Sequence, residues 1–432
     1  MTLRSRPFAV SLFGVVLLSV AGACDAAGQA AEMRPENHAR LDRIVDDVVA
    51  HYRLPGIAIG VLENGKITYV GTRGETVAGS GHPITRDTVF KIASNSKAMT
   101  ASVLARLVDA GKLRWEDPVT RYLPQFRMHD PWVTREMQVK DLLVHNSGLP
   151  QGGGDLMLWP EPNHFTREDI IAGLAHIKPA YSFRSSYAYD NLLYVVAGEV
   201  AASAAGIPYE TLVQQEIFEP LSLDRCRVGT WEYSANDDVA QPHVRREGRN
   251  VVGNADAGEV PVLVSAAAGG IRCSLADMLA WARNWVAPDA HALAWLSAEQ
   301  RRQAWVPRTP MPVSARRREW DGTRFYAYGY GWRIADVDGA MTVSHTGTLS
   351  GMYSVMTLLP DQKSGFVVLI NGVADDARTV FNDILLKYFT RPAHDQVVSF
   401  YASQLEQHAR QAATKSPATV APRDPVSAAV LQ

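Results

Sequence analysis

The sequence predicts an α+β fold in which an antiparallel sheet is flanked by helices and carries an inserted all-helical lobe. Three observations indicate this class. A helical pattern followed by a hairpin pattern stands near the N-terminus, several helical patterns fill the middle, and four β-rich runs come late in the chain. Strands at both ends of the chain, with helices between them, favour one sheet built from distant segments.

The N-terminal elements are marked by spacing and by turn residues. In HARLDRIVDDVVAHY (38–52), apolar residues recur at helical spacing, and a Pro-Gly pair follows as a stop signal. The next stretch, GIAIGVLENGKITYVGTRG (56–74), contains two alternating runs on either side of Asn64-Gly65. Because Asn-Gly suits a two-residue turn, we expect a helix followed by a β-hairpin.

The middle of the chain shows the patterns of several helices with recognisable ends. Thr166 and Ser274 are suited to cap the helices that follow them, and Gly111 and Gly206 stand where helices end. The late runs are rich in β-branched and aromatic residues, which favours strands. The expected helices are 94–110, 165–177, 192–206, 274–285 and 375–389, and the expected strands are 328–336, 340–345, 351–360 and 364–372.

The first residues differ from the rest of the chain. Arg4 and Arg6 precede a short apolar run followed by small residues, which is typical of a secretory signal peptide. Cys24 after Val-Ala-Gly-Ala also resembles a lipoprotein attachment site, so a lipid tether to a membrane is an alternative to a free protein. We therefore expect a periplasmic or secreted protein. Its expected parts are a signal peptide at 1–23, a flexible linker at 24–36, one large domain at 37–392, a C-terminal helix at 393–413 and a disordered tail at 414–432.

The composition excludes some classes of function. Of the 432 residues, 47% are hydrophobic, and the formal net charge is -2 with both signs mixed along the chain. This allows a large core and gives no basic surface for nucleic acid, so a small molecule or short peptide is the expected substrate. Beyond Cys24 the sequence contains only Cys226 and Cys273, without the clustered spacing of a metal site. We expect two separate buried thiols there, with one bridge as the alternative.

The stretch FKIASNSKAMTA (90–101) places Ser94 three residues before Lys97 at the start of a predicted helix. A hydroxyl is a weak nucleophile that needs a base within reach, and positions i and i+3 share one helix face. The helix N-terminus also offers N–H groups to a developing oxyanion. The pattern equally fits an N-cap serine ahead of a surface lysine, because about one Ser-x-x-Lys is expected by chance in a chain of this length.

A second pattern, Tyr189-Asp190-Asn191, stands just before an apolar helical stretch and is the only Tyr-x-Asn in the sequence. A neighbouring ammonium favours a phenolate, so we expect Lys97 to lower the pKa of Tyr189 and to share proton transfer with it. Asn191 is expected to orient Lys97 and to bind a substrate amide. The alternative is that Tyr189 packs in the lobe and Asn191 caps the helix.

A third pattern, His345-Thr346-Gly347, stands at the end of one predicted strand, with another strand after it. A strand edge beside the serine would bind an extended substrate by main-chain pairing. Gly347 would allow the backbone to come close. We expect the amides of Thr348 and Ser94 to form a two-donor oxyanion hole.

These three patterns, in this order, make the chain resemble the β-lactamase-related serine hydrolases. This family includes class C β-lactamases, penicillin-binding DD-peptidases, D-aminopeptidases and β-lactamase-like carboxylesterases. The likeness covers about residues 41–389 and includes stretches such as DPVTRYLPQF, LLVHNSGLP and YGYGW. It implies a β-lactamase/transpeptidase-like fold and a reaction without a metal or an organic cofactor.

The resemblance also implies a role for each matching residue. Ser94 would be the acylated nucleophile, Lys97 its proton acceptor, and Tyr189 the base that passes a proton to the leaving group and activates the hydrolytic water. Asn191 would position the substrate and the lysine. The substrate-binding strand would contain His345, Thr346, Gly347 and Thr348.

The chain departs from part of the family at His345, where the β-lactamases and many DD-peptidases carry lysine. A lysine would be a permanent cation for a substrate carboxylate, whereas a histidine is mostly neutral at pH 7. The difference favours the aminopeptidase and esterase branches, and we expect a substrate carboxylate to be held loosely or by other groups. His145 is interpreted as a structural histidine. Arg316–Arg318 are interpreted as a solvated turn in an irregular segment rather than an anion site.

The sequence thus favours an exported serine hydrolase that cleaves amide or ester bonds through an acyl-enzyme. Its candidate substrates are D-amino-acid peptides, peptidoglycan fragments, β-lactams and small esters. Two alternatives are a penicillin-binding sensor or scaffold that acylates without efficient turnover, and an inactive interaction module. The presence of both Tyr189 and Asn191 argues against the sensor, which has less need of them.

Overall fold

The α+β class is confirmed in a computed structural model of the chain. The structure describes residues 35–161, 164–234, 237–253, 255–256, 258–349, 351–393 and 397–415. The expected signal peptide, Cys24, most of the expected linker and the tail from residue 416 lie outside the described residues. In the described part, the main sheet has eight strands in the order β2-β1-β14-β13-β12-β11-β10-β9.

The main sheet joins the two ends of the domain. β1 pairs with β14 in antiparallel register, with Ile57 opposite Ile370. The expected hairpin is confirmed, and both Asn64 and Gly65 at its turn have positive φ. The strands are β1 Gly56–Glu63, β2 Lys66–Gly74, β9 Thr309–Pro310, β10 Tyr326–Tyr328, β11 Arg333–Val337, β12 Ala340–Leu349, β13 Met352–Leu359 and β14 Ser364–Ile370.

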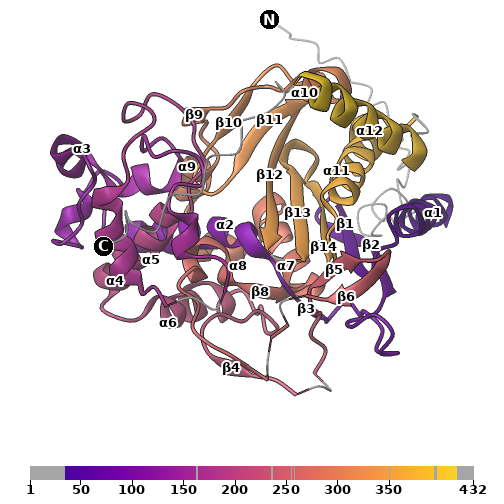
Figure 1. Cartoon of the computed structure of the whole chain (residues 1–432), viewed down its shortest axis with the longest axis horizontal. Helices are drawn as coiled ribbons and strands as arrows, with labels where there is room; N and C mark the ends of the chain where they lie inside the picture. The colour runs from indigo at the N-terminus through magenta and orange to yellow at the C-terminus, as the bar shows by residue number, and fades with distance from the viewer. Residues whose placement is uncertain are drawn as a thin grey trace, which may run out of the picture.

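Helices cover both faces of this sheet (Figure 1). One face carries α1 (Pro35–Tyr52), α11 (Asp375–Thr390) and α12 (Val398–Lys415), and the other carries α2 (Ser96–Asp109) and α7 (Leu275–Val286). The strand alternation predicted from the sequence produces two cores. In β1, Ile57, Ile59 and Val61 pack toward α1 and α11, while Ala58 and Leu62 pack toward α2 and α7. The nucleophile pattern therefore lies on the α2 face.

Within the long insertion between β2 and β9, the helices α3 to α6 form a lobe on the left of Figure 1. α5 is almost wholly buried at its centre, and Gly206 ends it in a left-handed conformation. Among the described helices, no single one is both long and apolar enough to cross a membrane. The bent pair formed by α5 and Tyr209–Phe218 is long and apolar enough only when the two are taken together. The other helices are α3 Pro131–Glu136, α4 Arg167–Gly173, α5 Leu192–Ala205, α6 Tyr209–Val213, α8 Ala290–Trp295, α9 Ala298–Ala304 and α10 Ala315–Asp321.

The described part of the insertion also contains three two-stranded sheets, β3-β8, β4-β7 and β5-β6. The pair β3-β8 matters for the site because β3 leads directly into the segment that carries Ser94. The strands are β3 Val89–Lys91, β4 Trp231–Glu232, β5 His243–Arg246, β6 Arg249–Val252, β7 Glu259–Val260 and β8 Arg272–Ser274.

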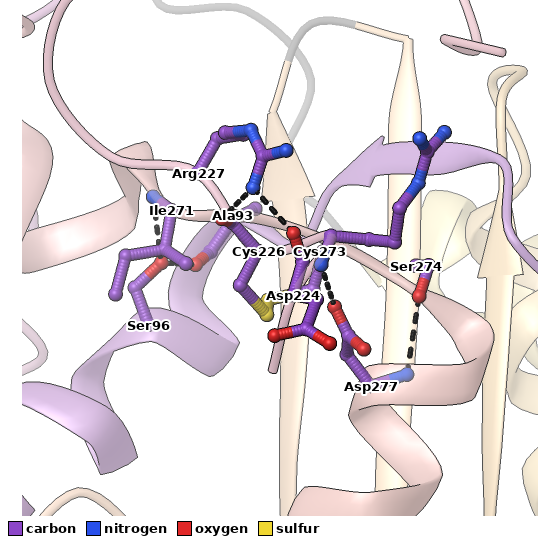
Figure 2. The surroundings of a disulfide bond; sticks show 10 residues. Ala93, Ser96, Asp224, Cys226, Arg227, Ile271, Cys273, Ser274 and Asp277 are labelled. Carbon is purple, nitrogen blue, oxygen red and sulfur yellow. Dashed lines mark hydrogen bonds between the residues drawn. A yellow bond between two sulfur atoms is a disulfide. The ribbon is translucent and has the colours of Figure 1, made fainter. Parts of the chain in front are cut away.

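The expectation of two separate thiols is wrong, because Cys226 and Cys273 form a disulfide (Figure 2). Cys273 lies on β8, opposite Phe90 of β3. The neighbouring residues Arg227 and Arg272 form a backbone bridge, which brings the two cysteines together. A contact of this kind between segments 47 residues apart leaves no signal in the local sequence.

The expectation of an irregular segment at Arg316–Arg318 is also wrong, because these residues lie in α10. The side chain of Ser314 caps the helix by accepting a hydrogen bond from the Arg317 amide, and Gly322 ends it in a left-handed conformation. Ser314 and Gly322 were visible in the sequence as possible helix ends. The three consecutive arginines between them, however, do not show the apolar spacing that normally indicates a helix.

Candidate active site

Ser94 lies in a tight turn between β3 and α2. It belongs to the 3-10 helix η1 (Ala93–Asn95), and the residue before it, Ala93, has φ +49. A non-glycine residue in this conformation costs on the order of 1–3 kcal/mol, so the surroundings must hold it there. The hydroxyl of Ser96 donates to the Ala93 carbonyl at 2.6 Å. The side-chain amide of Asn95 donates to the hydroxyl of Ser354 on β13 at 2.7 Å. Ser94 itself stays partly exposed.

Lys97 lies one helical turn after the serine and is fully buried. Its Nζ is 3.1 Å from Ser94 Oγ and donates to the Asn191 side-chain oxygen at 2.8 Å and to the Ala268 carbonyl at 2.6 Å. Burial lowers the pKa of Lys97 to about 7. A neutral amine has two N–H groups and one lone pair. When both N–H groups bind these two oxygens, the lone pair faces the Ser94 hydroxyl, which is the arrangement that a base requires.

Tyr189 approaches the serine from the lobe. Its hydroxyl donates to Ser94 Oγ at 2.8 Å, and the Lys97 ammonium lies 5.0 Å from its ring centre. The expectation of a lowered pKa is reversed. Burial raises the pKa of Tyr189 to about 12 and outweighs the opposing effect of the Arg333 cation. In the resting site the phenol therefore keeps its proton, and Lys97 is the group that titrates near neutrality.

Asn191 links the lysine to the lobe. Its side-chain oxygen accepts from Lys97, and its side-chain nitrogen lies 3.1 Å from each carboxylate oxygen of Asp155. These contacts fix the orientation of the amide. The expected hydrogen bond to a substrate amide would therefore compete with Asp155. Sequence reasoning missed Asp155, because an acidic residue in a glycine-rich loop has no spacing that ties it to a residue 36 positions later.

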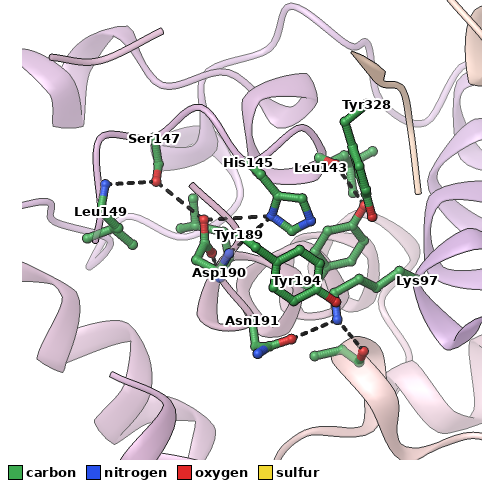
Figure 3. A network of polar contacts seen from close by, with 12 residues as sticks. Lys97, Leu143, His145, Ser147, Leu149, Tyr189, Asp190, Asn191, Tyr194 and Tyr328 are labelled. Atoms are coloured by element: carbon green, nitrogen blue, oxygen red, sulfur yellow. Dashed lines mark hydrogen bonds and ion pairs between the residues drawn. The ribbon is translucent and has the colours of Figure 1, made fainter. Parts of the chain in front are cut away.

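A buried network supports Tyr189 from behind (Figure 3). The His145 ring centre lies 4.3 Å from that of Tyr189 and 4.5 Å from that of Tyr328, and the Asp190 amide donates to His145 Nδ1 at 3.3 Å. Burial lowers the pKa of His145 to about 4, so its ring is neutral at pH 7. These contacts agree with a structural role for His145, which packs against the tyrosine and has no contact with Ser94 among the described hydrogen bonds.

His345 points into the protein rather than into the opening around Ser94. It is fully buried, and its Nε2 lies 2.8 Å from the hydroxyl of Tyr328. Burial, together with the cations of Arg333 and Lys97, holds the pKa of His345 well below its usual value. Its ring is therefore neutral and offers no charge to a substrate.

The part of β12 that follows His345 contacts the turn that carries Ser94. A Cβ atom on Gly347 would overlap the Ile92 carbonyl and lie 3.0 Å from the Cβ of Ala93, so only glycine lets β12 come this close to the turn. Thr346 and Thr348 alternate with Gly347 and have more exposed side chains. The register of β11 with β12 ends at the pair Arg333–Ser344, so the strand beyond Ser344 has an edge that β11 does not cover.

Two arginines that sequence reasoning missed hold this part of β12. Arg333 donates to the hydroxyl of Thr346 at 2.8 Å, and Arg378 donates to the Gly347 carbonyl and to the Thr348 hydroxyl, each at 2.7 Å. In a trans peptide the carbonyl and the next N–H point in opposite directions. Because Arg378 holds the Gly347 carbonyl, the Thr348 amide points away from Arg378, as an oxyanion-hole donor would need.

The structure therefore brings Lys97 and Tyr189 each within hydrogen-bonding distance of Ser94, with Asn191 joined through the lysine. It places Gly347 directly on the nucleophile turn. His345 lies behind the site on Tyr328. This arrangement supplies a hydroxyl nucleophile, an amine that is partly neutral at pH 7, a phenol proton donor and a strand edge for substrate.

Comparisons with known proteins agree with this geometry. A family model described as Beta-lactamase matches residues 41–388, so the chain belongs to the beta-lactamase family. It is 26% identical to penicillin-binding protein 4 of Amycolatopsis lactamdurans, over 81% of this chain and 89% of that protein. It is 25% identical to the D-alanyl-D-alanine-carboxypeptidase/endopeptidase AmpH of Escherichia coli K12, over 76% of this chain and 83% of AmpH.

Other relatives widen the range of chemistry and support the fold. Esterase EstB of Burkholderia gladioli is 30% identical over 44% of this chain and 50% of that protein. The octameric penicillin-binding protein homologue from Pyrococcus abyssi superposes with a TM-score of 0.67, at 22% identity, over 81% of this chain and 77% of that chain. The β-lactamase/transpeptidase-like fold expected from the motifs is thus confirmed, and two of these relatives are named as a carboxypeptidase/endopeptidase and an esterase.

Proposed function

We propose that this protein is an exported serine hydrolase that cleaves amide or ester bonds through an acyl-enzyme on Ser94. The observation that carries the proposal is that one hydroxyl oxygen contacts both a buried amine with a pKa of about 7 and a phenol. An ordinary N-cap serine has no need of either partner. A permanently charged lysine could not accept the proton of the serine.

In the proposed acylation step, Lys97 accepts the Ser94 proton while Oγ attacks the substrate carbonyl. The amides of Ser94 and Thr348 bind the oxyanion, and two such donors are commonly worth several kcal/mol, at about 2.7–4 kcal/mol for each one removed. Collapse of the intermediate breaks the bond to the leaving group. Tyr189 gives its proton to the departing nitrogen or oxygen and is left as a phenolate between Lys97 and Arg333.

Deacylation returns each proton to its origin. The phenolate of Tyr189 takes a proton from water, and the resulting hydroxide attacks the acyl carbonyl. When the bond to Oγ breaks, the Lys97 ammonium gives its proton back to Ser94. The phenolate thus exists only within the catalytic cycle, which fits a phenol whose pKa is raised to about 12 in the resting site.

The proposed substrates are D-amino-acid peptides, peptidoglycan fragments, β-lactams and small esters. Support comes from relatives whose names describe a penicillin-binding protein, a D-alanyl-D-alanine carboxypeptidase and an esterase. Export is supported by the leader pattern at residues 1–23 and by the disulfide, since such bonds persist in oxidising compartments. Lipidation of Cys24 would tether the same enzyme to a membrane.

The experiment compares the purified mature protein with Ser94→Ala on p-nitrophenyl acetate, a fluorescent penicillin and a fluorophosphonate. We expect ester turnover and covalent labelling that disappear in the variant. A stable adduct without turnover would support the penicillin-binding sensor instead. Labelling that survives Ser94→Ala, or none with any probe, would contradict the proposal.

A further inference from the structure

Asp155 is held in place by the glycine-rich stretch that precedes it. The amide of Gly152 donates to the carbonyl of Tyr189 at 2.8 Å, which ties this stretch to the segment of the Tyr-x-Asn motif. Gly154 has φ +82, and a Cβ atom there would overlap the side chain of Leu192. Because only glycine fits this conformation and this space, the stretch packs directly against the start of α5. The carboxylate of Asp155 is thus fixed beside the Tyr-x-Asn motif.

The contact between Asp155 and Asn191 determines which way the Asn191 amide faces. An ionised carboxylate only accepts hydrogen bonds, whereas the amide has an accepting oxygen at one end and a donating NH2 group at the other. The NH2 group lies 3.1 Å from both oxygens of Asp155, so the amide oxygen faces Lys97 (Figure 3). In the opposite orientation an oxygen would face the carboxylate, which would repel it and offer it no hydrogen.

The orientation of Asn191 decides what remains free on Lys97. In the observed orientation, the neutral amine donates its two N–H groups to Asn191 and to the carbonyl of Ala268, so its lone pair faces Ser94. If the amide were turned, its NH2 group would donate to the lone pair of the amine. An amine whose lone pair is occupied cannot take the proton of a nucleophile. Asp155 can therefore affect proton transfer through Asn191.

The negative charge of Asp155 also acts on the amine of Lys97. Burial lowers the pKa of Lys97 to about 7, against the effect of the carboxylates of Asp155 and Asp190. The cation of Arg333 adds to the effect of burial. Two phenols, which keep their protons at pH 7, also lie around the amine, with ring centres 5.0 and 5.2 Å from Nζ: Tyr189 and Tyr194. Loss of the Asp155 charge should therefore lower the pKa of Lys97 further.

We infer that Asp155 is a positioning residue of the proposed hydrolase, because its carboxylate keeps the oxygen of the Asn191 amide toward Lys97. The lone pair of the amine is thereby left for Ser94. The inference rests on the proposed function and adds to it a residue outside the three motifs. This role differs from a contact with substrate, since Asp155 acts through another side chain.

The first test changes the side chain at position 155. Asp155→Asn keeps the size but introduces an amide that can accept or donate, so Asn191 is no longer held in one orientation. We expect kcat and kcat/KM for p-nitrophenyl acetate to fall together by about 10- to 100-fold, the range of one hydrogen bond to a charged group, with less than about threefold change in KM. Asp155→Glu keeps the carboxylate and should lose less. A native rate in Asp155→Asn would overturn the inference.

The pH profile separates positioning from loss of structure. The inflection of kcat/KM, expected near pH 7 in the native enzyme, should lie at lower pH in Asp155→Asn, because a negative charge near the amine is removed. Burial raises the pKa of Asp155, although Asn191 and Lys97 oppose this, so native activity should also fall more steeply at the acid end. A loosened loop would instead admit water to the amine and move the inflection up, toward the usual lysine range. A lower rate with an unchanged or raised inflection would contradict the positioning role.

Glu161→Gln is the matched control. Glu161 is another partly buried carboxylate in the same part of the chain, but it accepts a hydrogen bond from Ser265, at 3.1 Å. It should leave the rate within about threefold of the native enzyme and the inflection unchanged. Thermal melting checks that each variant is folded.

A measurement without turnover tests the same inference. NMR titration of 13C-labelled lysines gives the pKa of Lys97 directly, and Lys97→Met identifies its signal. This pKa should be lower in Asp155→Asn than in the native protein and unchanged in Glu161→Gln. An equal or higher pKa in Asp155→Asn would overturn the positioning role. Failure of Ser94 to form an acyl-enzyme would instead overturn the proposed function, so the two failures are distinguishable.

Discussion

Lys97 and Asp383 are two buried ionisable groups on opposite faces of the main sheet. Lys97 lies on α2, and burial lowers its pKa to about 7. Asp383 lies on α11, where burial, reinforced by the neighbouring Asp321, raises its pKa. The same physical cause, removal from water, thus moves a cation and an anion toward their neutral forms.

The two groups differ in what they face. The amine of Lys97 faces a partly exposed hydroxyl 3.1 Å away. The carboxyl of Asp383 faces the Asn382 amide at 3.3 Å and Arg316 at 3.5 Å. Neither neighbour of Asp383 contains a hydroxyl group, so the carboxyl has no nucleophile to activate by taking its proton. A shifted pKa therefore indicates a functional group only when the group also faces an atom on which it can act. The following predictions test this difference between Lys97 and Asp383.

The largest effect is expected for Lys97→Met. Loss of the base should lower kcat/KM by about 10³-fold or more while p-nitrophenyl acetate still binds. Stability should change in the opposite direction. Between pH 7 and 10.5 the unfolded chain holds the lysine proton and the folded chain does not, so Lys97 reduces stability at pH 7 by roughly 4 kcal/mol as an upper figure. Kinetics and urea unfolding of the same sample measure both, and a slower and less stable variant would contradict this account.

The second effect concerns the close contact of β12 with the nucleophile turn. Gly347→Ala adds a methyl group where it would overlap the Ile92 carbonyl. We expect a loss of about 10²-fold in kcat/KM, because displacement of the strand misplaces the oxyanion donors. Gly269→Ala is the matched control. A Cβ there meets the same Ala93 at ordinary distances of 3.6–3.8 Å, so activity should stay within about threefold of the native enzyme.

The third effect concerns the Cys226–Cys273 disulfide, which lies on the same side of the main sheet as Ser94, and its contribution to stability. Replacing both Cys226 and Cys273 by serine opens a loop of 47 residues. The unfolding free energy should fall by about 2–4 kcal/mol in the chain-entropy account. Activity at 25 °C should stay near the native level, because the sulfur atoms have no described contact with Ser94. Guanidinium unfolding with and without reductant checks the first point, and an unchanged midpoint would refute it.

The fourth effect is the pH dependence of turnover. Only neutral Lys97 can act as the base, so kcat/KM should rise about tenfold per pH unit below pH 7 and level off above it. His345 should leave no inflection near pH 6.5, because its pKa lies well below the usual value. A profile that is flat from pH 5 to pH 9 would exclude Lys97 as the titrating base.

The smallest effect is expected for Asp383→Asn. Because the pKa of Asp383 is raised in the folded state, the unfolded chain ionises this group first as the pH increases, and stability falls in that range. The amide removes this penalty, so we expect a gain of about 1 kcal/mol at pH 7 that disappears near pH 4. Activity should not change. A loss of activity comparable with that of Lys97→Met would remove the distinction between the two groups.

Local signals in the sequence predicted the elements with local causes. Asn64-Gly65 predicted the first hairpin. Ser274 was expected to cap a helix, and its hydroxyl does accept a hydrogen bond from the Asp277 amide. The three catalytic candidates came from ordered motifs, and the family resemblance gave their roles. Only the relation of Ser94 to Lys97 could be argued from spacing, because both lie within one helical turn.

The features that escaped prediction depend on burial or on long-range contacts. The predicted direction of the pKa shift of Tyr189 was wrong, because burial outweighs the effect of the neighbouring charges. Burial cannot be seen in a short motif. Asp155 and Arg333 were missed because their partners Asn191 and Thr346 lie 36 and 13 residues away. The Cys226–Cys273 bridge depends on the pairing of β3 with β8, which no local pattern specifies.

The pairing of β1 with β14 has a consequence for how the molecule is made. Ile57 finds its partner only after Ile370 has been synthesised, and β12, which completes the site around Ser94, comes almost as late. Contacts so distant in the chain form slowly, and a growing chain cannot make them. A growing chain would therefore lack the assembled site, and the proposed hydrolytic activity would arise only after the last strands have joined the sheet.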